Sequence, residues 1–180
     1  RMIALDVAPL SSERLTLRAP SAMDWTYWER FITSERSRFV GGPRDRDTAW
    51  RAFGHIIGHW VLRGYGVFVF CLKGEDRPLG MAGPWHPIVW PEPEISWSIW
   101  DPAVEGKGLA YEAARATRLH AYETLGWPTA VSYIDEGNTR SIRLAERLGA
   151  RPDPGADRPP SLPGEAPCTV YRHPHPEMRP

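Results

Sequence analysis

Apolar residues recur along the first 150 residues with two different periods, and each period predicts a different kind of secondary structure. Alternation at every second position, or a short run of β-branched and aromatic residues, predicts a strand. Apolar residues spaced by three and four positions, between a capping residue and a glycine, predict a helix. On these signals the strands are predicted at residues 15–18, 67–72, 79–85, 94–100, 129–134 and 169–171, and the helices at residues 23–32, 47–64, 109–125 and 138–148.

The order of these elements predicts the fold class. Strands and helices are interspersed without strict alternation, which favours a mixed α/β (α+β) layer over a doubly wound parallel sheet. We expect one domain over residues 1–180, because no linker divides the first 150 residues. Nine of the 19 prolines lie between Pro152 and Pro180. Because proline lacks a backbone donor, residues 151–180 are expected to form an irregular or partly disordered Pro-rich segment.

The predicted strand at residues 94–100 has one apolar face and one polar face. Successive side chains of a strand point to opposite sides of the sheet, so a row of polar residues beside a row of apolar ones indicates two different surroundings. The apolar row is Ile95, Trp97 and Ile99, and the polar row is Glu94, Ser96 and Ser98.

Charge and composition narrow the class of protein. The 22 basic and 22 acidic side chains cancel, which argues against a general nucleic-acid binder, since such proteins need an excess of Lys and Arg. No apolar run approaches the length of about 20 residues that a membrane helix needs, and no signal-peptide pattern is present, so we expect a cytoplasmic protein. Cys71 and Cys168 lack the spacing of a zinc site or a disulfide framework and are expected to be free and buried.

A glycine-rich turn at residues 104–110 leads into the predicted helix at 109–125. Gly106 and Gly108 allow a tight turn, and the first N–H groups of a helix lack intrahelical acceptors and lie at its positive dipole end. The turn suits a pyrophosphate, although ordinary turns share this pattern. It fits neither a Walker loop, because Gly108 stands where Ser or Thr is needed, nor a dinucleotide fingerprint, because Tyr111 replaces its third glycine.

Three features occur together in the second half of the sequence: Gly-Lys-Gly-x-Ala at residues 106–110, the polar-faced strand before it, and Asn138-x-x-Ser141 followed by Leu148-Gly149. In this combination the sequence resembles the GNAT family of acyl-CoA-dependent N-acetyltransferases, over about residues 12–150. It is most similar to the branch that includes ribosomal-protein N-terminal acetyltransferases. The resemblance implies a GNAT-like acyl-CoA N-acyltransferase fold, with a mixed, mostly antiparallel sheet flanked by helices and no metal.

The resemblance also implies how acetyl-CoA is bound. The cofactor is expected across splayed strands, with its pyrophosphate at the glycine-rich turn and its pantetheine along the backbone near Ile99 and Trp100. Asn138 is expected to cap its helix, and the resemblance adds a contact with the cofactor. The expected cofactor-binding residues are Ile99, Trp100, Glu105, Gly106, Lys107, Gly108, Leu109, Ala110, Asn138 and Ser141.

Three positions depart from the family pattern. Glu105 replaces the usual Gln or Arg at the start of the phosphate motif, so its side chain is expected either to turn away or to weaken binding. Ala145 stands where the family often has a tyrosine as general acid, and Ala150 stands where it has a phenylalanine. Another residue must therefore supply the acid.

Direct acyl transfer needs a base that removes a proton from the amine and a donor for the leaving thiolate. Glu94 is the candidate base, because members of this family often carry a carboxylate there, and a solvated strand-end acid is the alternative. Ser96 and Ser98 either hold a relay water or only line the cleft. Ser141 is the candidate acid, with a surface serine as the alternative. Tyr133 either packs in the core or supplies the acid through its hydroxyl.

The segment at residues 85–93 is rich in tryptophan and proline. Its side chains are expected either to line the acceptor site or to close the end of the sheet as a small satellite core. The expected substrate-binding residues are Trp85, His86, Trp90, Glu94 and Ser96.

Four histidines suggest no chemistry of their own. His55 and His59 have the i, i+4 spacing of metal ligands, but no third ligand accompanies them, so a half-exposed helix face is the simpler interpretation. His173 and His175 lie in the Pro-rich segment and indicate little by themselves.

Three interpretations of the function remain open at this point. The first is an acetyl-CoA-dependent N-acetyltransferase that acts on a primary amine of a small molecule or a peptide N-terminus by direct attack. The second is a non-catalytic acyl-CoA-binding sensor or partner module, which the missing tyrosine keeps open. A nucleotide-binding turn is a third interpretation and predicts stabilisation by ATP rather than CoA. The sequence names no acceptor and leaves a homodimer open.

Overall fold

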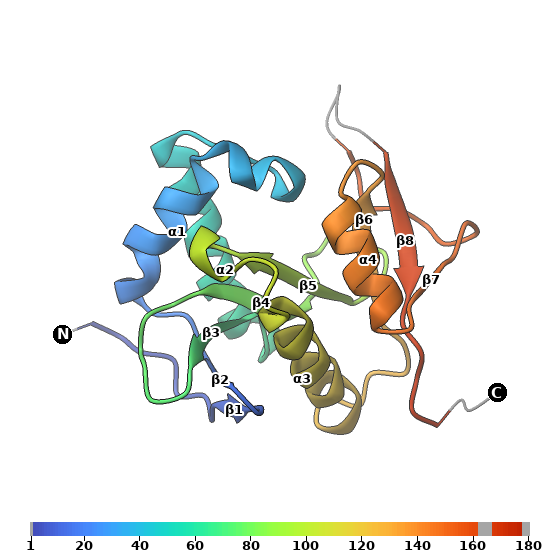
Figure 1. Ribbon diagram of the computed structural model, residues 1–180, viewed down its shortest axis with the longest axis horizontal. Helices are drawn as coiled ribbons and strands as arrows, with labels where there is room; N and C mark the ends of the chain where they lie inside the picture. Colours follow the sequence, from blue (N-terminus) through green and yellow to red (C-terminus); the bar gives the residue numbers. More distant parts are fainter. Residues whose placement is uncertain (1, 162–166, 178–180) are drawn as a thin grey trace.

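The computed structural model describes residues 2–161 and 167–177, and its strands join in one sheet (Figure 1). The strands are β1 (Leu10–Ser11), β2 (Leu15–Arg18), β3 (Phe68–Leu72), β4 (Gly80–Trp85), β5 (Glu94–Ile99), β6 (Val131–Asp135), β7 (Arg151–Pro152) and β8 (Cys168–Arg172). The helices are α1 (Trp25–Ile32), α2 (Arg46–Arg63), α3 (Leu109–Glu123) and α4 (Thr139–Arg147), with short 3₁₀ helices η1 (Ala22–Asp24), η2 (Glu35–Val40) and η3 (Pro102–Val104).

The strand order in the described part of the chain is β1-β2-β3-β4-β5-β6-β8-β7. Every neighbouring pair is antiparallel except β5 and β6, which are parallel. The predicted fold class, a mixed and mostly antiparallel sheet flanked by helices, is confirmed. All six predicted strands and four predicted helices are present with small boundary shifts, whereas the two-residue strands β1 and β7 and the 3₁₀ helices are too short to give a periodic signal.

Helices cover both faces of the sheet, and the alternation of β3 shows which face each helix covers. Val69 and Cys71 pack in a cluster with residues of α1 and α2. Phe68 and Phe70 point to the other side and pack in a cluster that includes Leu109 of α3. Figure 1 shows α3 and α4 in front of the sheet and the β6–β8 half of the molecule beside the β1–β5 half.

The predicted capping box forms at η1, the short 3₁₀ helix that leads into α1. Ser21 and Asp24 bond reciprocally, and the backbone N–H of Ser21 donates to Asp24 Oδ2 at 2.8 Å. Asp24 is also buried and forms a two-pronged ion pair with Arg18 of β2, with distances of 2.8 and 2.9 Å. The cap therefore also ties the first helical segment to the sheet.

The start of α2 differs from the prediction. Asp45 caps the helix instead of Asp47, because the carboxylate of Asp45 accepts hydrogen bonds from both the backbone N–H and the hydroxyl of Thr48. The buried face is also rotated from the one that the largest apolar residues suggested, since Trp50 is 59% exposed and Val61 is 72% exposed. The buried residues of α2 are Ala49, Phe53, Ile56, His59 and Trp60.

The Pro-rich segment contributes more regular structure than expected. Strand β8 pairs with β6 over five residue pairs and also with β7. Residues 162–166 and 178–180, on which part of the expected disorder falls, lie outside the described residues. Both cysteines are free, but only Cys71 is buried, whereas Cys168 at the start of β8 is half-buried. The expectation of two buried thiols is therefore wrong for Cys168.

Candidate active site

The sheet opens between β5 and β6. These strands share one bridging pair, Glu94 with Val131, after which they part. The register of β5 with β4, in which the N–H of Trp100 donates to the carbonyl of Leu79, directs the backbone groups of alternate β5 residues away from β4 and toward β6. Beyond the bridge, β5 therefore presents an unpaired strand edge to the opening.

Side chains donate hydrogen bonds to three backbone carbonyls along β5 and at its end. Ser132 Oγ of β6 donates to the Ile95 carbonyl at 2.6 Å. The Arg36 guanidinium of η2 donates to the carbonyls of Ile99 and Trp100 at 3.1 and 2.7 Å. The predicted pantetheine edge at Ile99 and Trp100 thus carries a hydrogen-bond donor of the protein itself, which an entering ligand must displace or share.

The glycine-rich turn lies at the mouth of this opening. Gly106 and Gly108 have φ values of 74° and 75°, a conformation that other residues rarely adopt. Gly108 caps α3 without any side-chain hydrogen bond, so the first amides of α3 have no capping side chain. A Cβ at Gly106 would meet nothing within 4 Å, and one at Gly108 would meet only guanidinium nitrogens of Arg14 and Arg147, at 3.6 and 3.7 Å.

This geometry suits a diphosphate. The first amides of α3 have no capping side chain, the glycines leave space beside them, and two guanidinium groups lie close by. Of these, Arg14 is paired with Glu112 of α3 at 2.7 Å. Lys107 is exposed, and its carbonyl accepts from Arg14 Nη1 at 3.0 Å. Leu109 and Ala110 are buried at the start of α3, so only their backbone is placed to meet a ligand.

Glu105 does not leave an unpaired negative charge at the turn. Its carboxylate pairs with Arg36 at 2.5 Å and with Arg140 of α4 at 2.6 Å. Partial burial of Glu105 opposes its ionisation, but the hydrogen bonds from Arg36 and Arg140 outweigh that effect and lower its pKa. The negative charge that Glu105 introduces in place of the family's Gln or Arg is therefore balanced by two arginines. Neither arginine lies near Glu105 in the sequence, so no local pattern predicts these pairs.

Glu94 lies where β5 and β6 begin to part, and it is 8% exposed. Its Oε2 accepts from the indole Nε1 of Trp90 at 2.6 Å, and its Oε1 accepts from the backbone N–H of Tyr133 at 3.4 Å. Burial raises its pKa to about 7, although both hydrogen bonds act in the opposite direction. The alternative of a solvated strand-end acid is wrong, and a carboxylate of this pKa suits proton transfer near neutral pH.

The aromatic segment before β5 packs against α2. The ring of Trp85 stacks on His59 with centroids 4.6 Å apart, and His55 lies 4.9 Å from the same ring. His59 Nε2 accepts from the backbone N–H of His86 at 2.9 Å. His59 is 3% exposed, so the expected half-exposed histidine face is wrong for this residue, because its ring fills the space between Trp85 and the end of α2.

The polar row of β5 lies on the same face as Trp85, because Trp85 and Glu94 are register partners of β4 and β5. Ser96 and Ser98 are half-buried, and the hydroxyl of Ser98 accepts from the indole of Trp100 at 3.1 Å. Trp85 packs at one end of the core, as the satellite-core interpretation of the 85–93 segment expects, and Trp90 contacts the candidate base. That this segment lines the acceptor site stays a prediction.

The two candidate acids, Ser141 at the start of α4 and Tyr133 of β6, differ in their surroundings. Asn138 caps α4 as predicted, with Oδ1 accepting from the N–H of Ser141 at 3.3 Å. Ser141 is half-buried, and its hydroxyl oxygen accepts from the indole of Trp97 at 3.1 Å, which leaves its own proton free to be donated. Tyr133 accepts from the N–H of Glu92 at 3.2 Å, and burial raises its pKa to about 12. Ser141 is therefore the better-placed donor on the α4 side of β5.

A buried polar chain on the other side of the opening escaped the sequence analysis. Arg118 of α3 donates to His173 Nδ1 at 3.1 Å, and His173 Nε2 lies 2.8 Å from the hydroxyl of Ser132. Because an arginine can only donate, Nδ1 must accept and the ring proton sits on Nε2. The hydroxyl of Ser132 then accepts from Nε2 and donates its own hydrogen bond to the Ile95 carbonyl. No local motif signals this chain, since its members come from three distant elements.

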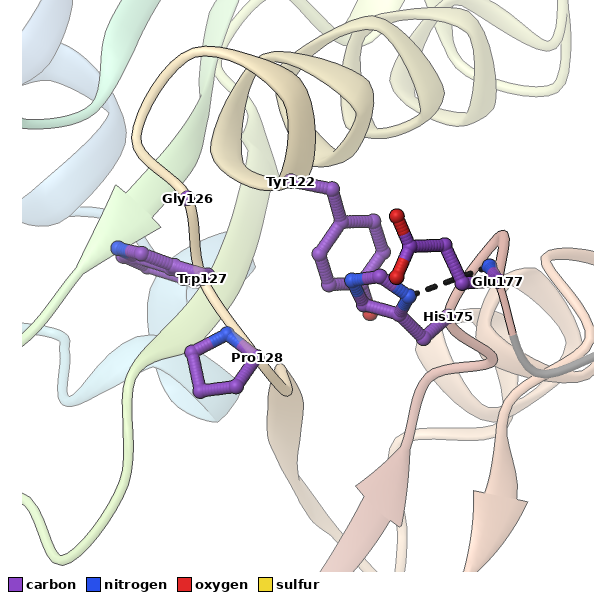
Figure 2. Close-up of a pocket in the computed structure, with 6 residues that line it drawn as sticks. All are labelled: Tyr122, Gly126, Trp127, Pro128, His175 and Glu177. Carbon is purple, nitrogen blue, oxygen red and sulfur yellow. Dashed lines mark hydrogen bonds between the residues drawn. The ribbon is translucent and has the colours of Figure 1, made fainter.

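Two surface cavities of the described residues are lined by side chains that do not include Glu94. One, of about 420 Å³, lies beyond the end of α3 and is lined by the residues drawn in Figure 2. The other, of about 500 Å³, lies beside the exposed ring of Trp50 on α2. The described residues bring no three metal-ligating side chains together, and none of their helices is long and apolar enough to cross a membrane.

A sheet opened at its one parallel pair, with bare helix amides at the mouth of the opening, defines an acyl-CoA-dependent transferase fold. Comparison with known proteins agrees: a family model described as an acetyltransferase (GNAT) domain matches residues 14–151. The chain belongs to the GNAT acetyltransferase family.

Solved structures extend this similarity over almost the whole chain. An acetyltransferase from Agrobacterium tumefaciens is 35% identical, with a TM-score of 0.86, over 97% of this chain and 99% of that one. A GNAT-family acetyltransferase from Bacillus anthracis is 21% identical, with a TM-score of 0.71, over 92% of this chain and 96% of that one. The ribosomal-protein α-N-acetyltransferase RimL in complex with coenzyme A is 15% identical, with a TM-score of 0.72, over 92% of this chain and 97% of that one. At 21% and 15% identity, the similarities to the last two structures show a shared fold.

Proposed function

We propose that this protein transfers the acetyl group of acetyl-CoA to a primary amine, of a small molecule or a peptide N-terminus, by direct attack. One observation carries the proposal: a buried carboxylate with a pKa near neutrality lies where β5 and β6 part. When bound, acetyl-CoA supplies an activated thioester. The residues around the opening then bind, orient and exchange protons.

The turn at residues 105–110 fits the diphosphate of the cofactor. The bare amides at the start of α3 and the guanidinium groups of Arg14 and Arg147 supply donors and positive charge. The open edge of β5 offers backbone donors and acceptors that an extended amide chain can pair with. Asn138 caps α4, and the hydroxyl of Ser141 in the first turn of that helix accepts from the indole of Trp97 in β5.

Glu94 acts as the base in this proposal. An amine must lose a proton to form the amide, and a carboxylate of pKa about 7 is substantially ionised at neutral pH while still able to hold that proton. Ser141 acts as the donor toward the departing sulfur, because its proton is not used in its hydrogen bond with Trp97. Trp85 and Ser96 lie on the same face of β4 and β5 as Glu94. In this proposal they and His86, which follows Trp85 in the chain, line the approach of the acceptor.

The test follows thiol release from acetyl-CoA in the presence of a panel of amines that includes amino acids, polyamines and short peptides. We expect release with at least one acceptor, and a loss of about 10- to 10⁴-fold in turnover for Glu94→Gln with CoA affinity retained. CoA binding without release above background for any acceptor would favour a non-catalytic acyl-CoA-binding module. Full turnover in Glu94→Gln would remove Glu94 from the mechanism.

A further inference from the structure

Among the described residues, two groups donate hydrogen bonds to the Glu94 carboxylate, and the bond from Trp90 is the shorter one. The indole Nε1 of Trp90 lies 2.6 Å from Oε2, whereas the backbone N–H of Tyr133 lies 3.4 Å from Oε1. From its place in the Trp- and Pro-rich segment, Trp90 is expected to line the acceptor site or to pack in a satellite core. Its polar atom instead points at the carboxylate.

The segment around Trp90 holds the indole in this direction. The N–H of Trp90 donates to the carbonyl of Pro87 at 3.0 Å, and the carbonyl of Trp90 lies 3.2 Å from His86 Nε2. The Trp90 ring meets the ring of Tyr133 edge-on, with centroids 6.2 Å apart. Prolines at 87, 91 and 93 fix the backbone on both sides of Trp90. The indole N–H is thus set before any ligand binds.

The charged surroundings of Glu94 make this neutral donor important. The described structure gives Glu94 no ion pair, and Arg172 of β8 is engaged with Glu92 at 2.8 Å. The thiol of Cys168 has a pKa raised mainly by burial, with the charge of Glu94 as a smaller contribution. The titratable or charged groups on the elements packed around Glu94 include His86 and Glu92 of the preceding loop, Tyr133 and Asp135 of β6, Cys168 and Arg172 of β8, and His55, His59 and Arg63 of α2.

We propose that Trp90 is a positioning residue for Glu94: its indole N–H orients the carboxylate and stabilises its ionised form, so that Glu94 accepts a proton from the amine. This inference rests on the proposed function, in which Glu94 is the base. It gives the distinctive segment at residues 85–93 a role in the chemistry as well as in packing.

Trp90→Phe is the informative substitution, because phenylalanine keeps an aromatic ring and removes the N–H. A hydrogen bond to an ionised group is worth enough to move the acid limb of the kcat/KM profile upward by about one to two pH units. We expect the acid limb of Trp90→Phe to shift by this amount. On the high-pH plateau Glu94 is ionised even without the indole N–H, so the acceptor KM should change by less than about threefold there. Trp50→Phe, on the exposed face of α2, is the matched control and should leave the profile of the wild type.

An NMR titration tests the same hydrogen bond without any acceptor substrate. In a ¹H–¹⁵N spectrum of the wild-type protein, the indole resonance that disappears in Trp90→Phe should titrate with a midpoint near pH 7. In Glu94→Gln the same resonance should not titrate in this range, since no carboxylate remains to change its charge.

The outcomes separate the positioning role from the proposed function. If Glu94→Gln loses turnover but Trp90→Phe raises acceptor KM with an unmoved acid limb, Trp90 lines the acceptor site and the inference is overturned. An indole resonance that ignores Glu94 also overturns it. If the resonance titrates with Glu94 while Glu94→Gln keeps full turnover, the hydrogen bond exists but the proposed function fails, and the positioning role fails with it.

Discussion

Replacing His173 by glutamine tests whether the buried chain at the β5–β6 opening is held by a neutral histidine. His173 is 4% exposed and lies between the guanidinium of Arg118 and the hydroxyl of Ser132. Burial and the positive charge of Arg118 lower its pKa from 6.5 to about 3. A glutamine amide also offers a donor and an acceptor but does not titrate in this range.

The sign of the effect follows from the direction of the shift. A histidine whose pKa is lower in the folded state contributes stability above its unfolded pKa of 6.5, and this stability is lost as the pH falls toward 3. Between pH 8 and pH 5 the loss from His173 amounts to about 2 kcal/mol. Glu94 acts in the opposite direction, because its pKa is raised to about 7, so its contribution is present at low pH and is lost as the pH rises through 7.

The assay is urea unfolding of the wild type and of His173→Gln at pH 8 and at pH 5. Because the Glu94 contribution is common to both proteins, it cancels in the comparison. Relative to the wild type, His173→Gln should gain about 2 kcal/mol of unfolding free energy on going from pH 8 to pH 5, whatever the substitution costs at pH 8. An equal pH dependence in the two proteins would show that His173 is not buried as a neutral base and would refute the tautomer assigned to the chain.

Three further substitutions test other parts of the structure. Gly108→Val should weaken CoA binding at least tenfold by calorimetry, because valine disfavours a φ of 75° and its side chain would cover the bare amides; wild-type affinity would remove the pyrophosphate assignment. Ser141→Ala should lower kcat by about 10²-fold with unchanged CoA affinity, and Ser141→Thr should restore part of it; an unchanged kcat would leave the thiolate to another donor. Asp24→Ala should cost about 3 to 5 kcal/mol of unfolding free energy, since it removes the buried carboxylate and leaves the half-buried Arg18 with the exposed carboxylate of Asp76 at 3.4 Å. A cost below about 1 kcal/mol in urea unfolding would contradict the importance of the Arg18–Asp24 ion pair.

The sequence predicted the elements whose signals are local. The alternation of β5, the capping of α4 by Asn138 and the glycine stop of α2 at Gly64 each depend on a few neighbouring residues, and each is observed. The cap of α2 was misplaced because Asp45 and Asp47 both precede a helical pattern, and only the bond from Thr48 distinguishes them. The exposed ring of Trp50 shows that residue size alone does not select the buried face of a helix.

The candidate site was predictable where a motif marks it and hidden where distant elements meet. The turn at Gly106 and Gly108 and the carboxylate of Glu94 were found from sequence, and the structure places both at the β5–β6 opening. The pairing of Glu105 with Arg36 joins positions 69 residues apart. The partners of His173 lie in α3 and β6. Such contacts depend on the packing of the whole sheet, and no spacing within one element encodes them.

The hydrogen bonds at the opening show why the base and the cleft occur together. The N–H of Val131 donates to the carbonyl of Pro93, so a continuing parallel ladder would bring the N–H of Tyr133 to the carbonyl of Ile95. Side chains take both groups instead: Ser132 donates to Ile95, and Glu94 accepts from Tyr133. The same exchange that ends the ladder therefore fixes the carboxylate at the point where the strands separate. A substitution that restores the ladder at this point would close the cleft and displace the base in one step.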